Sequence, residues 1–81
     1  MAKLPIVSGK RLIQFLKGLG YEVIRQKGSH VRLRKRTKIG THNITVPYHK
    51  EIAMGTLNDI LTQVALWNNI SKEELVKRLK E

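Results

Sequence analysis

The sequence predicts an α+β domain, in which a three-stranded antiparallel sheet carries helices on one face and a short helix closes the chain. Two observations indicate this class. Apolar residues recur at helical spacing near both ends of the chain, and the segments between them have strand composition around short turn signals. The 81 residues suffice for one small hydrophobic core, so a single domain over residues 1–81 is expected.

The first helix is bounded by a capping residue and a glycine. Ser8 can accept a hydrogen bond from the first turn, and Gly20 is the kind of residue at which helices end. Between them the apolar side chains lie three or four positions apart, so they share one face that we expect to be buried. These side chains are Leu12, Phe15, Leu16 and Leu19.

Two segments, YEVIRQK and HVRLRKR, flank Gly28-Ser29 and have the composition of β-strands. A two-residue loop with glycine first favours a type II′ hairpin turn. This turn pairs Lys27 with His30 and, further along the ladder, Ile24 with Leu33.

The segment HNITV is a third predicted strand, and it ends at Pro47. With Ile39-Gly40 as the second turn, Leu33 pairs with Val46. Directly opposed residues share a face of the sheet, so both hairpins place their aliphatic residues on the same side. We expect helices to cover that side, which carries Ile24, Val31, Leu33 and Val46.

A second helix is predicted from Thr56, and Asn68-Asn69 ends it. Ser71 and Glu74 then form a capping box that opens a short third helix. The apolar face of the longer helix consists of Leu57, Ile60, Leu61, Val64 and Trp67.

The net charge is +10, and it is unevenly distributed along the chain. Residues 1–50 contain twelve Lys or Arg and a single acid, whereas the remainder contains four Lys or Arg and five acids. Such a field attracts nucleic acid, an acidic membrane or an acidic protein, and the alternative is a solvated basic face without a partner. With no cysteine and no long apolar run, we expect no disulfide, signal peptide or membrane span, and a cytoplasmic location.

The uncovered face of the predicted sheet gathers much of this charge. Cations directly opposed across strands repel each other, at a cost of up to about 1 kcal/mol per pair, and a fold tolerates this more readily where the face meets anions. The arginine fork matches phosphate oxygens in bidentate geometry. The pattern therefore predicts a phosphate-binding surface made of Arg25, Lys27, Arg32 and Arg34.

His30 lies on the same face, immediately after Gly28-Ser29. An imidazole exchanges a proton near neutral pH, and neighbouring cations favour the neutral form that a general base needs. On RNA, such a base can activate a 2′-hydroxyl against the adjacent phosphorus, while Arg32 or Lys27 stabilises the charge on the phosphate. The alternative is a turn histidine that only contacts phosphate or solvent.

The remaining histidines and the tyrosines carry weaker signals. His42 has the core-side parity of its strand, so we expect it to pack near the end of the sheet. His49 follows Pro47 in a loop, where it either helps to hold a substrate or is a plain surface residue. Of the aromatic residues, Tyr21 and Tyr48 are the two that could stack on bases. Three histidines, without cysteine or a carboxylate at ligand spacing, predict no metal site, and no cofactor is expected.

Three segments occur in a characteristic order: SGKRLIQFLKGLGYEVIRQKGSHVRLR, then ITVPYHKEIAMGTLNDILTQ, then ISKEELVKRL. Their most specific parts are Gly28-Ser29-His30 and the stretch from Pro47 through His49 to Gly55-Thr56-Leu57. Together, over about Ser8 to Leu79, they closely resemble the HicA (YcfA-like) toxins, which are small mRNA interferases of toxin–antitoxin pairs.

The resemblance implies a fold similar to a double-stranded RNA-binding domain and an endoribonuclease that cleaves mRNA without a metal. It matches the family's catalytic histidine to His30, which Gly28 and Ser29 would hold exposed. It also implies a HicB-like antitoxin that binds the toxin and masks its active site.

Two features depart from the family pattern. The connection ALWNNIS, Ala65–Ser71, is a few residues longer than usual, and the helix start GTLND lacks the lysine cluster of true double-stranded RNA-binding domains. Single-stranded or locally open mRNA is therefore the expected substrate. A non-catalytic RNA-binding module on the same face is the alternative function, and a docking surface for an acidic protein is a third. Membrane binding is not expected, because no helix pairs a basic face with an aromatic edge.

Overall fold

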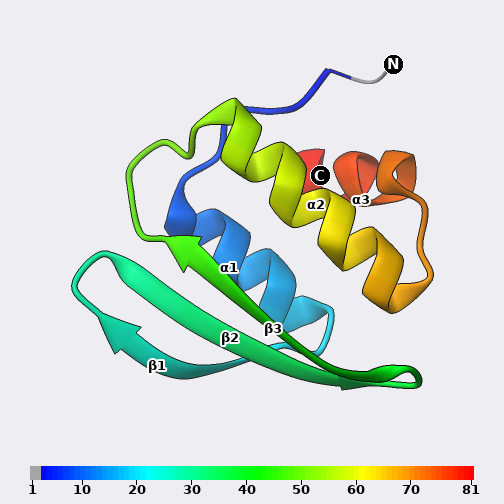
Figure 1. Ribbon diagram of the computed structural model, residues 1–81. Helices are drawn as coiled ribbons and strands as arrows, with labels where there is room; N and C mark the ends of the chain where they lie inside the picture. The colour runs from blue at the N-terminus through cyan, green and yellow to red at the C-terminus, as the bar shows by residue number, and fades with distance from the viewer. Residues whose placement is uncertain (1–2) are drawn as a thin grey trace.

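The computed structural model describes residues 3–81, and it has the predicted α+β architecture. All three helices lie on the same side of a three-stranded antiparallel sheet, with α1 and α2 packed on the sheet and α3 packed on α2 (Figure 1). The order of the elements is consistent with a fold of the double-stranded RNA-binding type. These elements are α1 (Gly9–Gly18), β1 (Glu22–Lys27), β2 (His30–Thr37), β3 (Gly40–Pro47), α2 (Met54–Asn68) and α3 (Lys72–Lys80).

The first hairpin forms at the predicted loop. Lys27 pairs with His30 across Gly28-Ser29. Gly28 has a φ of 57°, while Ser29 does not have a positive φ. Glycine at the first loop position is therefore required by the turn, as the type II′ prediction states.

The predicted register of this hairpin is wrong beyond Arg25. A β-bulge between Val23 and Arg25 leaves Ile24 unpaired, so Leu33 pairs with Val23 and not with Ile24. The extra residue shifts the alternation of the strand, and the side chain of Ile24 is 40% exposed. Ile24 is thus not part of the core, contrary to the sequence prediction, because β1 is an edge strand in which a bulge disturbs only one ladder.

The second turn lies one residue earlier than predicted, at Lys38-Ile39. Thr37 therefore pairs with Gly40, and Leu33 pairs with Ile44 and not with Val46. The hydroxyl of Thr37 donates to the carbonyl oxygen of Gly40 at 2.7 Å across this two-residue turn. The ladder is displaced by two residues, an even number, so the aliphatic side chains still face the helices as predicted.

Both predicted boundaries of α1 are confirmed. The Ser8 hydroxyl accepts a hydrogen bond from the backbone N–H of Arg11 at 3.0 Å, and Gly20 follows the helix with a φ of 106°. Leu12 and Leu16 are fully buried, and the other two residues of the predicted face pack partly buried against the core.

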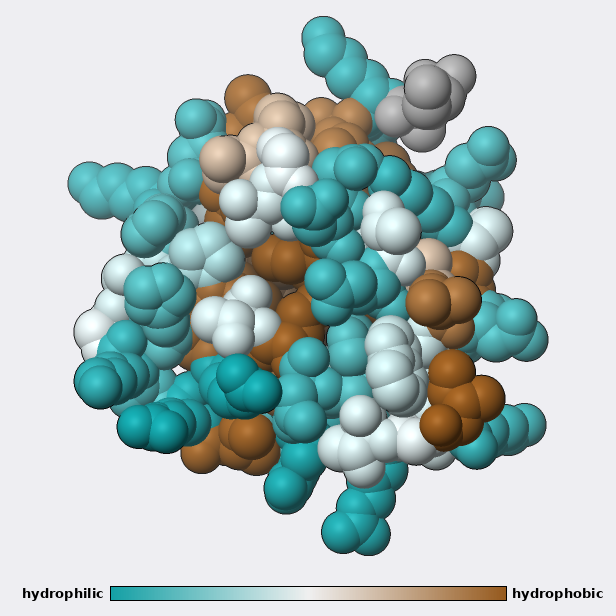
Figure 2. Space-filling view, in the orientation of Figure 1, coloured by the Kyte–Doolittle hydropathy of each residue, from teal (hydrophilic) through white to brown (hydrophobic). Residues whose placement is uncertain are grey.

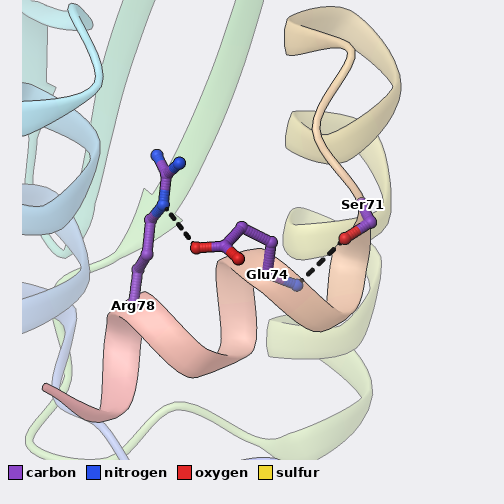
Figure 3. A network of polar contacts seen from close by, with 3 residues as sticks. All are labelled: Ser71, Glu74 and Arg78. Atoms are coloured by element: carbon purple, nitrogen blue, oxygen red, sulfur yellow. Dashed lines mark hydrogen bonds and ion pairs between the residues drawn. The ribbon is translucent and has the colours of Figure 1, made fainter.

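Helix α2 begins at Met54, two residues before the predicted start, and the N-cap residue Ala53 makes no side-chain capping bond. It ends where predicted, because Asn69 adopts the left-handed conformation. Ser71 caps α3 as predicted, because its hydroxyl accepts from the N–H of Glu74 at 3.1 Å. The Glu74 carboxylate does not close the other half of the predicted capping box but accepts from Nε of Arg78 at 2.9 Å (Figure 3).

The core lies between the sheet and the helices, and its centre is entirely aliphatic. In the view of Figure 2, polar residues cover most of the surface and apolar residues show between them near the centre. Among residues 3–81, no helix has both the length and the apolar character needed to cross a bilayer. The fully buried side chains are Leu12, Leu16, Leu33, Val46, Ile52, Leu57, Leu61, Val64 and Leu75.

Candidate nucleic-acid interface

His30 is the first residue of β2 and lies on the sheet face that the helices leave open. It pairs with Lys27 on one side and with Pro47 on the other, and its side chain is exposed to solvent. The alternation of β2 decides this placement, because Val31 and Leu33 on either side of Arg32 are buried in the core.

An open depression of about 620 Å³ surrounds His30, and we call it the basic depression. It brings together six of the seven residues that the sequence predicted for the site. None of its residues is acidic, so the field inside it attracts anions. The residues that line it are Arg25, Lys27, Gly28, Ser29, His30, Arg32 and Thr45.

Like charges oppose each other directly in this depression. Arg25 pairs with Arg32 across the β1–β2 ladder, and Thr45 lies beside Arg32 on β3. Opposed cations of this kind destabilise the sheet by up to about 1 kcal/mol. Thr45 was not predicted as a site residue, although it alternates with two buried residues and this parity indicates the open face.

Arg34 is the one predicted site residue outside the basic depression. Its guanidinium donates to the carboxylate of Glu22 at 3.1 Å, in a pair that is largely exposed. Exposed ion pairs of this kind contribute about 0–1 kcal/mol and exchange readily for another anion. Arg34 thus lies outside the depression that contains His30, and Glu22 partly offsets its charge.

The turn that precedes His30 is braced from behind by the loop between β3 and α2. The N–H of Tyr48 donates to the carbonyl oxygen of Ser29 at 2.6 Å, and the N–H of Gly9 donates to the carbonyl oxygen of His49 at 2.8 Å. A Cβ atom on Gly9 would overlap the carbonyl oxygen of Pro47, so this contact requires glycine. No local pattern in the sequence indicates this brace, because it joins three segments that are distant along the chain.

A second polar cluster lies at the opposite end of the sheet, where His42 is 3% exposed. The prediction that His42 is a packing residue is confirmed. Its ring stacks on Trp67 with the centroids 5.0 Å apart, and its Nδ1 lies 2.6 Å from the hydroxyl of Tyr21. Its Nε2 lies 3.4 Å from the side-chain oxygen of Gln63. These partners assign the proton to Nε2, with the Tyr21 hydroxyl donating to Nδ1.

Burial lowers the pKa of the His42 imidazole, and the hydrogen bond to Gln63 opposes this shift. Burial likewise raises the pKa of the Tyr21 hydroxyl, and a hydrogen bond from Asn68 opposes that shift. Tyr21 is 3% exposed, so the expectation that it could stack on bases is wrong. In the folded protein the Tyr21 hydroxyl instead donates to Nδ1 of the buried His42.

Tyr48, by contrast, is 47% exposed and lies beside the braced turn. His49 is also exposed, in the loop where the sequence placed it. Among residues 3–81, no three His, Asp or Glu side chains are grouped in a way that could hold a metal ion.

Comparison with protein-family models gives a match to the HicA toxin of bacterial toxin–antitoxin systems over residues 9–66. Comparisons with curated proteins and with solved structures give no match. The matched region runs from the start of α1 through the sheet and most of α2, and it includes the basic depression. Because the match covers well over half of the 81 residues, the chain belongs to the HicA toxin family.

Proposed function

We propose that the protein is an endoribonuclease that cleaves mRNA, with His30 as the general base and the basic depression as the site that holds the RNA backbone. Toxins of the HicA family are generally mRNA interferases, which makes RNA cleavage the expected activity of a member. The observation that carries the proposal is the position of His30, which is exposed inside a depression lined by three cations and no acid.

The reaction needs one group to accept a proton and others to hold negative charge. His30 takes the proton from a ribose 2′-hydroxyl, and the 2′-oxygen forms a bond to the adjacent phosphorus. The bond from phosphorus to the 5′-oxygen breaks, and the departing oxygen takes up a proton from solvent water. Arg32 and Lys27 flank His30 and stabilise the charge that develops on the phosphate oxygens. No step of this reaction requires a metal ion.

Single-stranded or locally open RNA fits the described surface better than a duplex. The first turn of α2, from Met54 to Leu57, contains no cation, so it offers no grip on duplex phosphates. A 2′-hydroxyl is the nucleophile in this scheme, so DNA would bind through its phosphates but would not be cut.

Membership of a toxin–antitoxin family implies an antitoxin partner. We propose that a HicB-like antitoxin covers the basic depression and masks His30, since an acidic surface would neutralise the cations there as RNA does. Arg34 extends the same face toward Glu22, and it serves as a further backbone contact once its exposed ion pair opens.

The test is turnover of labelled single-stranded RNA by substoichiometric protein in excess chelator. The unmodified protein should cleave many equivalents of RNA, and His30→Ala should cleave at least about 100-fold more slowly because the general base is gone. Both should melt at similar temperatures and bind the RNA with similar affinity, since the imidazole is exposed.

The control is Gln14→Ala, an exposed position on α1, which should cleave as the unmodified protein does. Salt-dependent retention of RNA without any turnover would favour the non-catalytic RNA-binding module instead. Normal cleavage by His30→Ala would show that His30 is not the base.

A further inference from the structure

A second hollow, of about 310 Å³, lies between the start of α1 and the loop that follows β3. We call it the Tyr48 hollow. The function proposed above makes no use of it. Its lining comes from two segments that are distant in sequence, and it contains two lysines, a histidine and an exposed tyrosine. The lining residues are Ser8, Lys10, Tyr48, His49 and Lys50.

The Tyr48 hollow lies directly beside the turn that carries His30. Pro47 pairs with His30 in the sheet, and the next residue, Tyr48, donates its backbone N–H to the carbonyl oxygen of Ser29 at 2.6 Å. One backbone hydrogen bond therefore links the two sites. The backbone that carries Tyr48 therefore adjoins the His30 turn.

The Tyr48 ring is available for stacking. It is 47% exposed, and the aromatic contacts found among residues 3–81 involve Tyr21, His42 and Trp67 but not Tyr48. Nucleic-acid bases stack on such rings irrespective of their sequence. A tyrosine is well suited to this because its ring is rigid and its polar edge tolerates water.

The charge around this ring favours a phosphate. Lys10 and Lys50 are both exposed, and the ion pairs found among residues 3–81 involve neither of them. The nearest acid in sequence, Glu51, does not line the hollow. A nucleotide offers the flat base and the adjacent anion that this combination of ring and cations requires.

The two backbone segments beneath the hollow are joined to each other before any ligand binds. Gly9 packs backbone to backbone against residues 47–49, and Ile52 donates its N–H to the carbonyl oxygen of Val7 at 2.9 Å. These contacts hold the backbone that carries the tyrosine and the lysines, while the side chains themselves are exposed. Less backbone conformational entropy is then lost when RNA binds.

We propose that the Tyr48 hollow is a nucleotide subsite, in which the base next to the scissile phosphate stacks on Tyr48 while Lys10 and Lys50 bind its phosphate. This inference rests on the proposed function in that it takes RNA as the ligand of the neighbouring depression. The subsite adds Tyr48, which binds the substrate through its base. We therefore expect cleavage to depend on a nucleotide being present on that side of the scissile phosphate.

The experiment measures binding in the non-cleaving His30→Ala background, by fluorescence anisotropy of a short single-stranded RNA. Tyr48→Ala should weaken binding about 10-fold, as expected for the loss of one stacked base, whereas Tyr48→Phe should bind as before. We then compare a series of RNAs, each with one abasic position. In the protein that keeps Tyr48, one of these RNAs should bind about 10-fold more weakly than the intact RNA. That member should lose nothing further when Tyr48→Ala is introduced.

The lysines provide a second measurement. Lys10→Gln and Lys50→Gln together should lower the magnitude of the slope of log affinity against log salt by about 0.7, the value for the one single-strand phosphate that the two lysines share. Lys17→Gln, near the other end of α1, removes one such charge and should leave the slope unchanged.

The results separate the subsite from the proposed function. If RNA binding depended on Tyr48 but the unmodified protein never cleaved RNA, the subsite would be supported and the proposed function would be refuted. If every abasic RNA lost the same affinity, whether or not Tyr48 was present, the subsite would be refuted. The proposed cleavage of RNA would not be affected by that result. If Tyr48→Ala weakened only antitoxin binding, the surface would belong to the protein partner and the subsite would also be refuted.

Discussion

Substitution of Gly9 by alanine tests the brace that holds the His30 turn. The added Cβ would overlap the carbonyl oxygen of Pro47, lie 2.8 Å from the Cα of Tyr48 and lie 3.1 Å from the N of His49. All three are backbone atoms, so no side chain can rotate away to make room. The start of α1 and the 47–49 loop must therefore separate.

The size of the effect follows from two contacts. Overpacking of this kind costs about 1–3 kcal/mol, and the hydrogen bond from Gly9 to His49, 2.8 Å long, contributes about 1 kcal/mol. The lower entropy of alanine in the unfolded chain offsets about 0.5–1 kcal/mol. The free energy of unfolding should thus fall by about 1–3.5 kcal/mol, which lowers the melting temperature of a domain of this size by roughly 4–28 °C.

The assay is thermal unfolding followed by circular dichroism, with Gly18→Ala as the matched control. Gly18 belongs to the same helix, and no atom lies within 4 Å of the position of its added Cβ. This control should gain about 0.5–1 kcal/mol because alanine is the better helix residue. RNA cleavage by Gly9→Ala should also fall at temperatures below its transition, since the same loop supports Ser29. A Gly9→Ala protein as stable as its Gly18→Ala counterpart would refute the close approach of α1 to the loop.

Two further predictions concern pH and the antitoxin. Burial places the pKa of His42 in the folded protein below its ordinary value of about 6.5, which is the value in the unfolded chain. As the pH falls below about 6.5, the unfolded chain therefore takes up a proton before the folded protein does. The stability that His42 contributes is thus fully present above about pH 6.5 and is lost as the pH falls below it. Urea unfolding between pH 8 and pH 5 should show this loss in the unmodified protein and equally in His30→Ala, and a flat profile would contradict the buried, neutral imidazole. Purified cognate antitoxin should release labelled RNA from His30→Ala in proportion to the antitoxin added; a stable ternary complex would show that the antitoxin does not cover the basic depression.

Local signals in the sequence were enough for both ends of α1, for the end of α2 and the start of α3, and for the faces of β2 and β3. Ser8 and Ser71 cap their helices as predicted, because capping depends on residues only three positions apart. The alternation of β2 placed His30 and Arg32 on the open face, and this survived an error in the second turn because the displacement was an even number of residues. The family resemblance likewise depended on motifs that could be read directly, and the family match confirmed it.

Neighbours that are distant along the chain decided the rest. The bulge at Ile24 belongs to an edge strand, in which a change of register disturbs one ladder only. As an aromatic residue, Tyr21 was a candidate for stacking on bases. In the structure it is buried, and its hydroxyl is hydrogen-bonded to the buried His42. Arg34 lies four residues from His30 along β2, and the pairing of its guanidinium with Glu22 across the β1–β2 ladder depends on the register of the hairpin.

By itself, the sequence determined which elements form, which face of the sheet carries the cations, and that an imidazole stands among them, since spacing and turn chemistry act over a few residues. Tertiary structure alone decided that Gly9 and the loop after β3 meet behind the His30 turn, and that Tyr48 and Lys10 share one hollow. The physical reason is that these contacts join backbone segments about forty residues apart, whose approach depends on how the helices pack on the sheet and leaves no periodic trace in the chain.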